Sequence, residues 1–466
     1  MIDFLIMYEV RVRELESIIL LGNELKKRGY SVEYLSFDFV NLKDYINNRK
    51  LLKKYFNNVK VVLMPSLYHN KELYNIVYYV AGNCKNIVNL RWEQYFSNKV
   101  MNNTDSFLFP HELAKKAYHV CWGEWSYETL LHAGIDDNKL LKTGALQLDF
   151  LRKELSQYYL NREKLFEFYK LPNDKKTVLY MSSFASATMT ERQFKGGEKD
   201  FDGAYKKDDA AVSFSKKSYE STLNWINELL SIRKDITFVY RPHPSENITG
   251  KLEELSDKYS NFRIISDYSV KQWILTCDCI LTWVSTSIVE AYFAGKSCFI
   301  VRPVTYEFEN DMSVYRGARF IDNKKDFFDC IDRVCECSVS EEMMKRCYYY
   351  DSDAAYIKLS NCLEKILRDE ENEFEWDEDL ANKFEKSRRK LLFNSVLANL
   401  YRIVIGIMAK ITSKVNLSFG TDLDSRIENY LVKKKKDSYE TYNKKSFVEI
   451  DNRIREVLNT QDVKRI

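Results

Sequence analysis

The sequence predicts an α/β fold made of two Rossmann-like domains in tandem, followed by a helical C-terminal extension. Short apolar runs alternate with helical periodicity twice along the chain, a rhythm typical of parallel sheets with right-handed crossovers. The length of 466 residues exceeds what one ordinary hydrophobic core accommodates. Strand signals stop near residue 369, and the remaining sequence is charged and helical.

The first domain is predicted to span residues 1–171. Residues 3–8 are predicted to form a buried strand. Asp3 and Glu9 interrupt the apolar start, so the segment does not have the pattern of a signal peptide. Residues 13–28 have helical periodicity that ends at Gly29, a residue suited to a C-cap. The later strands are predicted at residues 31–36, 59–64, 86–90, 119–122 and 140–142.

The second domain is predicted to span residues 172–369, with a turn-rich boundary at residues 171–174. Its strands are predicted at residues 177–181, 236–241, 262–265, 279–282 and 297–301. The polar stretch at residues 185–213 is predicted to be a long loop. Two such units place a cleft between the carboxyl ends of their sheets, where α/β proteins bind ligands.

Composition excludes several classes of protein. A formal net charge of +3 argues against a dedicated nucleic-acid binder. The ten cysteines lack the spacing of a disulfide framework or a zinc site, which predicts reduced thiols in a cytoplasmic protein.

The clearest local motif is residues 240–246, which follow a predicted strand. Two prolines fix the turn and present Arg241 and His243 at the carboxyl end of that strand. A guanidinium and an imidazole in this position suit a phosphate or diphosphate. The alternative is an ordinary strand exit whose histidine packs inside.

A second motif covers residues 282–291, where a strand ends and a helix opens near Ser285. Hydroxyl groups around a helix N-terminus favour anion binding. The spacing of Ser287 and Glu290 also fits a capping box, which needs no ligand. The hydroxyls of Ser182 and Ser183, after another strand of this domain, form a third and weaker candidate. The predicted donor-binding residues are Arg241, His243, Ser182, Ser183, Ser285, Thr286, Ser287 and Glu290.

The first domain is expected to hold the acceptor and the catalytic base at its strand exits. Glu9 follows the first strand, and the sequence Arg91-Trp92-Glu93-Gln94 follows the fourth. A glutamate walled by tryptophan suits a base with a raised pKa. The predicted catalytic residues are Glu93, Glu9 and His243, and the predicted acceptor-binding residues are Arg11, Arg13 and Trp92. Surface salt bridges or helix caps are the alternatives, and Glu124 fits a cap best.

The combination resembles the GT-B glycosyltransferases, and more narrowly the bacterial transferases of surface carbohydrates and capsules. Residues 241–244 match the His-Pro motif of the Kdo and polysialic-acid transferases, and residues 285–287 with Glu290 match their Ser/Thr motif. Teichoic-acid glycerophosphotransferases are related. Residues 13–16 and 142–145 also resemble nucleotide-sugar enzymes.

This resemblance implies that His243 contacts the donor phosphate, that the Ser/Thr cluster helps to bind it, and that no metal or cofactor is required. It favours a CMP-sugar donor and a surface polysaccharide or lipid-linked glycan as acceptor. The sequence contains no Walker A or G-x-G-x-x-G motif and no Asp-x-Asp motif at a strand exit. A glycerophosphotransferase, a nucleotide-sugar epimerase and a non-catalytic scaffold of a glycan assembly complex remain alternatives.

The extension, residues 370–466, is expected either to lie on an anionic membrane surface or to pack on the two domains. Lys383, Lys386 and residues 388–390 precede the apolar segment 391–411, and residues 433–436 are all lysine. A basic flank beside an apolar face suits an interfacial helix. The protein is therefore expected in the cytoplasm, with a peripheral location on the inner face of the membrane as one reading.

Overall fold

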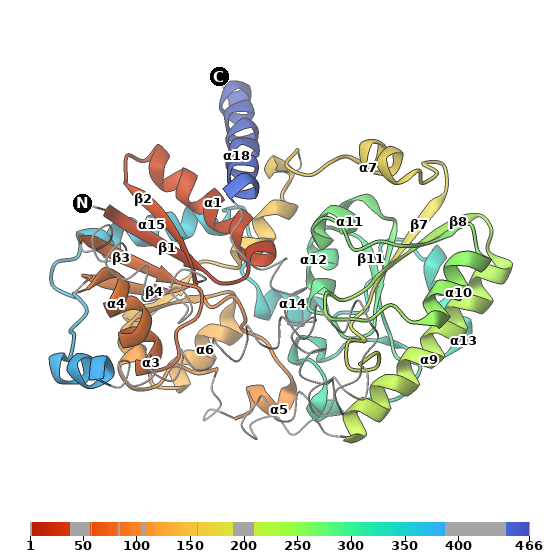
Figure 1. Cartoon of the computed structure of the whole chain (residues 1–466), viewed down its shortest axis with the longest axis horizontal. Coiled ribbons are helices and arrows are strands. Elements are labelled where there is room, and N and C mark those ends of the chain that lie inside the picture. The colour runs from red at the N-terminus through yellow and green to blue at the C-terminus, as the bar shows by residue number, and fades with distance from the viewer. Residues whose placement is uncertain are drawn as a thin grey trace, which may run out of the picture.

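The computed structural model contains two α/β units that form separate lobes (Figure 1). It describes residues 2–37, 56, 58–82, 84–103, 108–155, 157–189, 209–386 and 444–465. Each unit is built on a six-stranded sheet in which every pairing is parallel. The prediction of two Rossmann-like domains with a helical C-terminal region is therefore confirmed.

The N-terminal sheet has the strand order β2-β1-β3-β4-β5-β6. Its strands are β1 (Ile2–Tyr8), β2 (Val32–Ser36), β3 (Val59–Met64), β4 (Asn86–Asn89), β5 (Tyr118–Cys121) and β6 (Leu140–Lys142). The chain leaves β1 toward β2 on one side and returns to β3 on the other. The strand order therefore reverses between β1 and β3, and ligands bind at such a switch point outside the carboxyl ends of the strands.

The C-terminal sheet has the order β12-β11-β10-β7-β8-β9, with its switch point between β7 and β10. Its strands are β7 (Lys176–Met181), β8 (Ile236–Arg241), β9 (Phe262–Ile264), β10 (Cys279–Thr282), β11 (Ser297–Val301) and β12 (Phe320–Ile321). The sequence analysis missed β12, because a strand of two residues leaves no periodic pattern.

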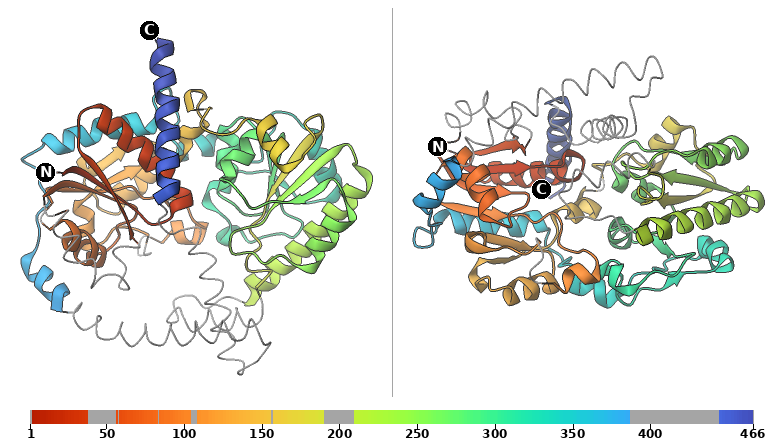
Figure 2. Two further views of the ribbon diagram at one scale, coloured as in Figure 1. Left: turned by 45° about the horizontal axis from the view of Figure 1, so that its top comes forward. Right: turned by 60° about the horizontal axis from the view of Figure 1, so that its bottom comes forward.

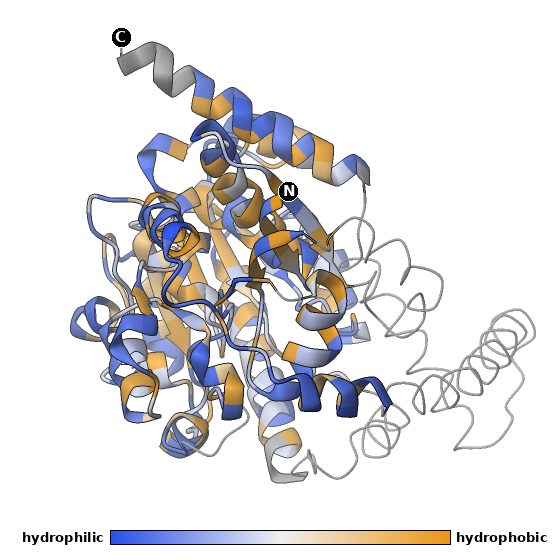
Figure 3. Ribbon diagram, turned by 90° about the vertical axis from the view of Figure 1, so that its left-hand side faces the viewer, coloured by the Kyte–Doolittle hydropathy of each residue, from blue (hydrophilic) through white to orange (hydrophobic). Residues whose placement is uncertain are grey.

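Apolar side chains along β1 alternate between two hydrophobic clusters, one on each face of the N-terminal sheet. Phe4 and Ile6 pack in one cluster with helix α1 (Arg11–Lys27), while Leu5 and Met7 pack in another with residues of the segment 73–81. Since both faces are covered, the central strands are apolar throughout, as expected for a buried parallel sheet. Figure 3 shows hydrophobic residues concentrated in these strands.

The C-terminal sheet is covered in the same way. Helices α11 (Val270–Thr276) and α12 (Ser287–Phe293) pack on one face, and α9 (Asp209–Ile232) packs on the other. Because α9 begins at Asp209, the predicted loop at residues 185–213 extends too far; its residues 190–208 lie outside the described part of the chain. All ten cysteines are free.

His119 on β5 is fully buried and its ring is hydrogen-bonded at both nitrogens, with Ala114 O at 3.0 Å and Asn89 Nδ2 at 3.2 Å. Burial, together with the charge of Arg91, lowers the pKa of His119 from 6.5 to about 3. Between pH 6.5 and about 3, the unfolded chain therefore binds a proton at His119 that the folded protein does not bind.

We therefore expect the stability of the protein to fall through this group by up to about 1.4 kcal/mol per pH unit as the pH decreases from 6.5 toward 3. The variant His119→Gln, whose amide can keep both hydrogen bonds, should show a flatter dependence. Urea unfolding at a series of pH values measures the difference. Parallel curves for the two proteins would contradict the expectation.

After the C-terminal sheet the chain returns to the first lobe before residue 369, the predicted domain end. Helix α15 (Ala355–Arg368) lies against α1, where Glu364 forms an ion pair with Arg28 at 3.0 Å. The turn at residues 142–145 meets the returning chain closely: Gly144 has φ +92°, and a Cβ there would lie 2.5 Å from Tyr349 O. This packing gives the turn a structural role.

The described parts of the extension pack on the N-terminal lobe. Trp376 donates from its indole to Cys84 O at 3.1 Å, and Phe384 stacks on Tyr74. Helix α18 (Lys444–Arg465) lies on α1 (Figure 2), with Asp451 bonded to Asn23 at 2.9 Å. In the described residues no helix is both long and apolar enough to cross a membrane. The apolar segment 391–411 and the lysines at 433–436 lie outside them.

Candidate active site

The three polar motifs of the second domain meet at the β7/β10 switch point. Ser183 Oγ, after β7, accepts a hydrogen bond from Val284 N, after β10, at 3.1 Å. Ser182 N donates to Arg241 O, at the end of β8, at 2.9 Å. Parallel strands end at one edge, so motifs separated by up to about a hundred residues in sequence become neighbours.

Glu246 holds the proline turn in place, a role that the sequence analysis did not assign. Its buried carboxylate accepts from Ser182 Oγ and from Tyr240 OH, both at 2.6 Å, and from His243 N at 3.2 Å. Burial raises the pKa of Glu246, while these hydrogen bonds oppose the rise. The hydroxyl of Ser182, which was predicted to bind the donor, therefore bonds to Glu246 and helps to hold the turn that carries His243.

The imidazole of His243 is exposed, so it does not pack inside. Its Nδ1 accepts from Ser245 N at 3.1 Å, which selects the tautomer with the proton on Nε2. The guanidinium of Arg241 is half-buried and donates to Asp267 O at 2.8 Å and to Tyr268 O. Arg241 therefore also ties the end of β8 to the loop that precedes α11.

The Ser/Thr motif is fixed by Tyr315, which lies thirty residues further along the chain. Tyr315 OH accepts from Ser285 N and donates to Ser285 O, both at 2.8 Å. Helix α12 begins at Ser287 with Thr286 as its N-cap and no side-chain cap, so the capping-box alternative is wrong. Ser287 N donates to Ser285 Oγ at 3.2 Å, whereas Thr286 N has no protein acceptor among the described residues.

Glu290 belongs to a buried ionic cluster between the two lobes. Lys271 on α11 is paired with Glu16 on α1, and Tyr159 OH donates to both oxygens of Glu16 at 2.9 and 3.0 Å. Desolvation raises the pKa of Glu290, and the charge of Lys271 opposes this rise. The charges of Glu16 and Glu290 hold the pKa of Lys271 above its ordinary value despite burial.

The candidate base lies in a cluster of charges at the carboxyl edge of the N-terminal sheet. Arg13 pairs with Glu93 and, at 2.8 Å, with Glu14. Glu14 is fully buried and also accepts from Glu9 N at 2.8 Å. Burial raises the pKa of Glu14, more than the charge of Arg13 lowers it. Burial raises the pKa of Tyr68, after β3; the charges of Glu93 and Glu9 add to the rise, while those of Arg91 and Arg13 oppose it.

The other predicted acceptor residues lie at different places. The Trp92 ring is buried in the hydrophobic core, while the neighbouring Glu93 carboxylate is exposed. Arg11 Nη1 donates to Ser446 Oγ on α18 at 2.8 Å, so this side chain contacts the C-terminal helix.

The exits of β4 and β10, one from each sheet, are joined across the two lobes. Ser97, on the loop after β4, forms an antiparallel bridge with Met312, and Ser313 N donates to Phe96 O at 2.7 Å. Tyr315 then holds Ser285 in the next turn. The segment 311–315 thus connects the two strand exits across the lobes.

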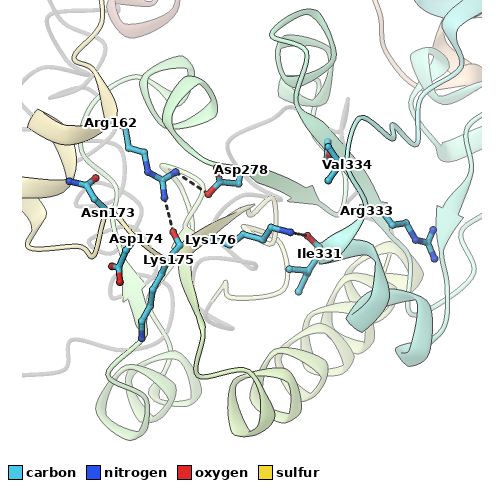
Figure 4. Close-up of a pocket in the computed structure, with 10 residues that line it drawn as sticks. Arg162, Asn173, Asp174, Lys175, Lys176, Asp278, Ile331, Arg333 and Val334 are labelled. Carbon is cyan, nitrogen blue, oxygen red and sulfur yellow. Dashed lines mark hydrogen bonds and ion pairs between the residues drawn. The ribbon is translucent and has the colours of Figure 1, made fainter.

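The pocket in Figure 4 lies at the opposite, amino edge of the C-terminal sheet. It has a volume of about 520 Å³ and includes Lys176 at the start of β7 and Asp278 before β10. Arg162 donates to Asp278 at 2.9 Å, and Lys176 donates to Ile331 O at 3.0 Å. These polar groups bond to other residues of the pocket, and ligands of open α/β sheets bind at the opposite, carboxyl edge.

No group of three or more His, Cys, Asp or Glu residues in the described ranges is arranged to hold a metal ion. At the carboxyl edge of the C-terminal sheet, the Arg241 guanidinium and the His243 imidazole are hydrogen-bond donors suited to a phosphate.

The sequence matches no protein-family model and no curated protein. Solved structures with a similar fold include a UDP-N-acetylglucosamine 2-epimerase (15% identity, 79% of this chain and 97% of that chain, TM-score 0.49). A second is the Neisseria meningitidis UDP-GlcNAc 2-epimerase bound to UDP-GlcNAc (13%, 78% and 100%, 0.46). A third is a variant of the wall teichoic acid polymerase TagF (13%, 79% and 89%, 0.46). At these identities and TM-scores the similarity assigns no activity to the chain.

Proposed function

We propose that this protein is a metal-independent glycosyltransferase that moves a sugar from a nucleotide-activated donor to a surface polysaccharide or a lipid-linked glycan. The observation that carries the proposal is the meeting of three strand-exit motifs at the β7/β10 switch point, with the His243 turn fixed by buried Glu246. Such a preorganised set of hydrogen-bond donors suits the phosphate of a departing nucleotide.

In the proposed mechanism the second domain holds the donor. The Nε2–H of His243, the guanidinium of Arg241 and the N–H of Thr286 stabilise charge on the leaving phosphate. Ser285 and Ser287 complete the contacts to the donor. The resemblance of the His-Pro and Ser/Thr motifs to CMP-sugar transferases is the reason to name a cytidine nucleotide first.

The first domain supplies the acceptor side. Glu93 or Glu9 removes the proton from the acceptor hydroxyl, and Arg13 orients Glu93 through their ion pair. Buried Glu14 holds Arg13 and the backbone of Glu9, so it positions both candidate bases. The contact between the β4 exit loop and residues 312–313 links the two lobes on this side, which supports an acceptor site facing the donor site.

Incubation of the purified full chain with CMP-, UDP- and CDP-activated donors tests the proposal by product analysis. Transfer to a glycan acceptor with release of nucleotide, unchanged by EDTA, is the expected result. Interconversion of the donor sugar without transfer would make the protein an epimerase, and release of CMP from CDP-glycerol a glycerophosphotransferase. Binding of a donor without any turnover would favour the alternative of a non-catalytic scaffold. Activity that EDTA abolishes and magnesium restores would overturn the metal-independent mechanism.

A further inference from the structure

Arg91, two residues after β4, has a buried guanidinium of which two nitrogens have no hydrogen-bonding partner in the described residues. Its side chain is 3% exposed, and its Nε and Nη1 atoms have no acceptor in the described part of the chain. Its backbone lies in the left-handed region at φ +51°, which is uncommon for a residue with a side chain. Asn89 and Gln94 each bond to the main chain of Arg91, so they hold its backbone, and neither side chain bonds to its guanidinium.

Among the residues that the structure describes, Arg91 forms no ion pair with a carboxylate. Burial lowers the pKa of Arg91, and the groups that oppose this are Tyr68, Cys121 and Tyr95, none of them a carboxylate. His119 beside it is held neutral. An isolated buried guanidinium is expensive, so proteins pair such groups or use them to bind a ligand.

Arg302, at the end of β11, shows how this chain treats a structural buried arginine. It is equally buried at 3%, but it donates to Asp311 Oδ1 at 2.6 Å and to Trp283 O. Arg302 has its counterion inside the protein, whereas Arg91 lacks one at the edge where the N-terminal sheet binds ligands.

We propose that Arg91 receives an oxyanion of the acceptor, a phosphate or a carboxylate, so that the acceptor is an anionic molecule. Arg91 lies just beyond the carboxyl end of β4, two residues before the candidate base Glu93. An anion bound there would sit beside the candidate bases and carry the acceptor hydroxyl toward them. This assignment to the acceptor rests on the proposed function; the anion site itself does not.

A comparison of two variants separates a ligand site from a structural role. Arg91→Met removes an unpaired charge, so the melting temperature of the protein should stay unchanged or rise. Arg302→Met leaves Asp311 buried without its partner, so the melting temperature should fall by several degrees. An equal fall in Arg91→Met would show that Arg91 is structural and would overturn the proposal.

Anion binding is measured with inorganic phosphate and with acetate, each added to the His243→Ala protein so that the donor site contributes less. Phosphate or acetate should raise the melting temperature of this protein, and adding Arg91→Met should clearly reduce that rise. The two anions distinguish a phosphate from a carboxylate. A rise that Arg91→Met leaves unchanged, or the absence of any rise with both anions, would overturn the proposal. Titration of the wild-type protein with CMP and UDP tests the donor site separately.

Discussion

We expect the variant His243→Ala to lose about 10²–10³-fold in kcat while the protein stays folded. Its imidazole is exposed, so removal creates no cavity, and Glu246 still fixes the turn through Ser182 and Tyr240. The loss arises because one oriented donor to the leaving phosphate is removed at the moment when charge develops. Steady-state kinetics with the donor found by product analysis measures it.

His132→Ala is the matched control, because His132 is also an exposed histidine but lies on α6 (Glu124–His132), where its ring bonds to Glu128 O. This variant should keep the wild-type kcat. A His243→Ala enzyme with near-normal kcat/KM would remove His243 from the reaction.

The second large effect concerns the ionic cluster between the lobes. Lys271→Met should lower the free energy of unfolding by about 3–5 kcal/mol, since Glu16 would remain buried without its counterion. Tyr159 offers Glu16 a hydrogen bond but no charge, so it compensates only in part. Urea unfolding followed by circular dichroism gives this free energy.

The double variant Glu16→Met with Lys271→Met should recover much of the loss, because it removes both charges. Lys324→Met breaks the exposed pair between Lys324 and Glu228 and should cost less than about 1 kcal/mol. A Lys271→Met protein as stable as Lys324→Met would mean that the buried pair contributes little to the contact between the lobes.

Most of the fold could be predicted from the sequence because both sheets are parallel and buried on both faces. Such strands are continuous apolar runs, so β3 was predicted at residues 59–64, as found. The runs do not encode strand order, which depends on how each crossover packs. The packing of α15 on the first lobe could not be predicted either, because its amphipathic pattern is the same whichever lobe it covers.

The candidate site was predicted where its signals are local. The prolines at residues 242 and 244 mark the turn that presents His243, and the turn is where the sequence places it. Groups that act across long distances left no such mark: Tyr315 reaches Ser285 over thirty residues, and Lys271 reaches Glu16 over 255. Arg91 belongs to the predicted exit of the fourth strand, but only the structure shows that two of its guanidinium nitrogens lack a partner.

The burial of α1 has a consequence for how the chain matures on the ribosome. Residues 11–27 are synthesised long before two of the helices that pack on them, α15 and α18. Leu20 and Leu21 have no solvent exposure in the finished molecule. While the second lobe is still being translated, the first lobe lacks these two helices, so we expect part of α1 to stay accessible to chaperones until α18 has been made.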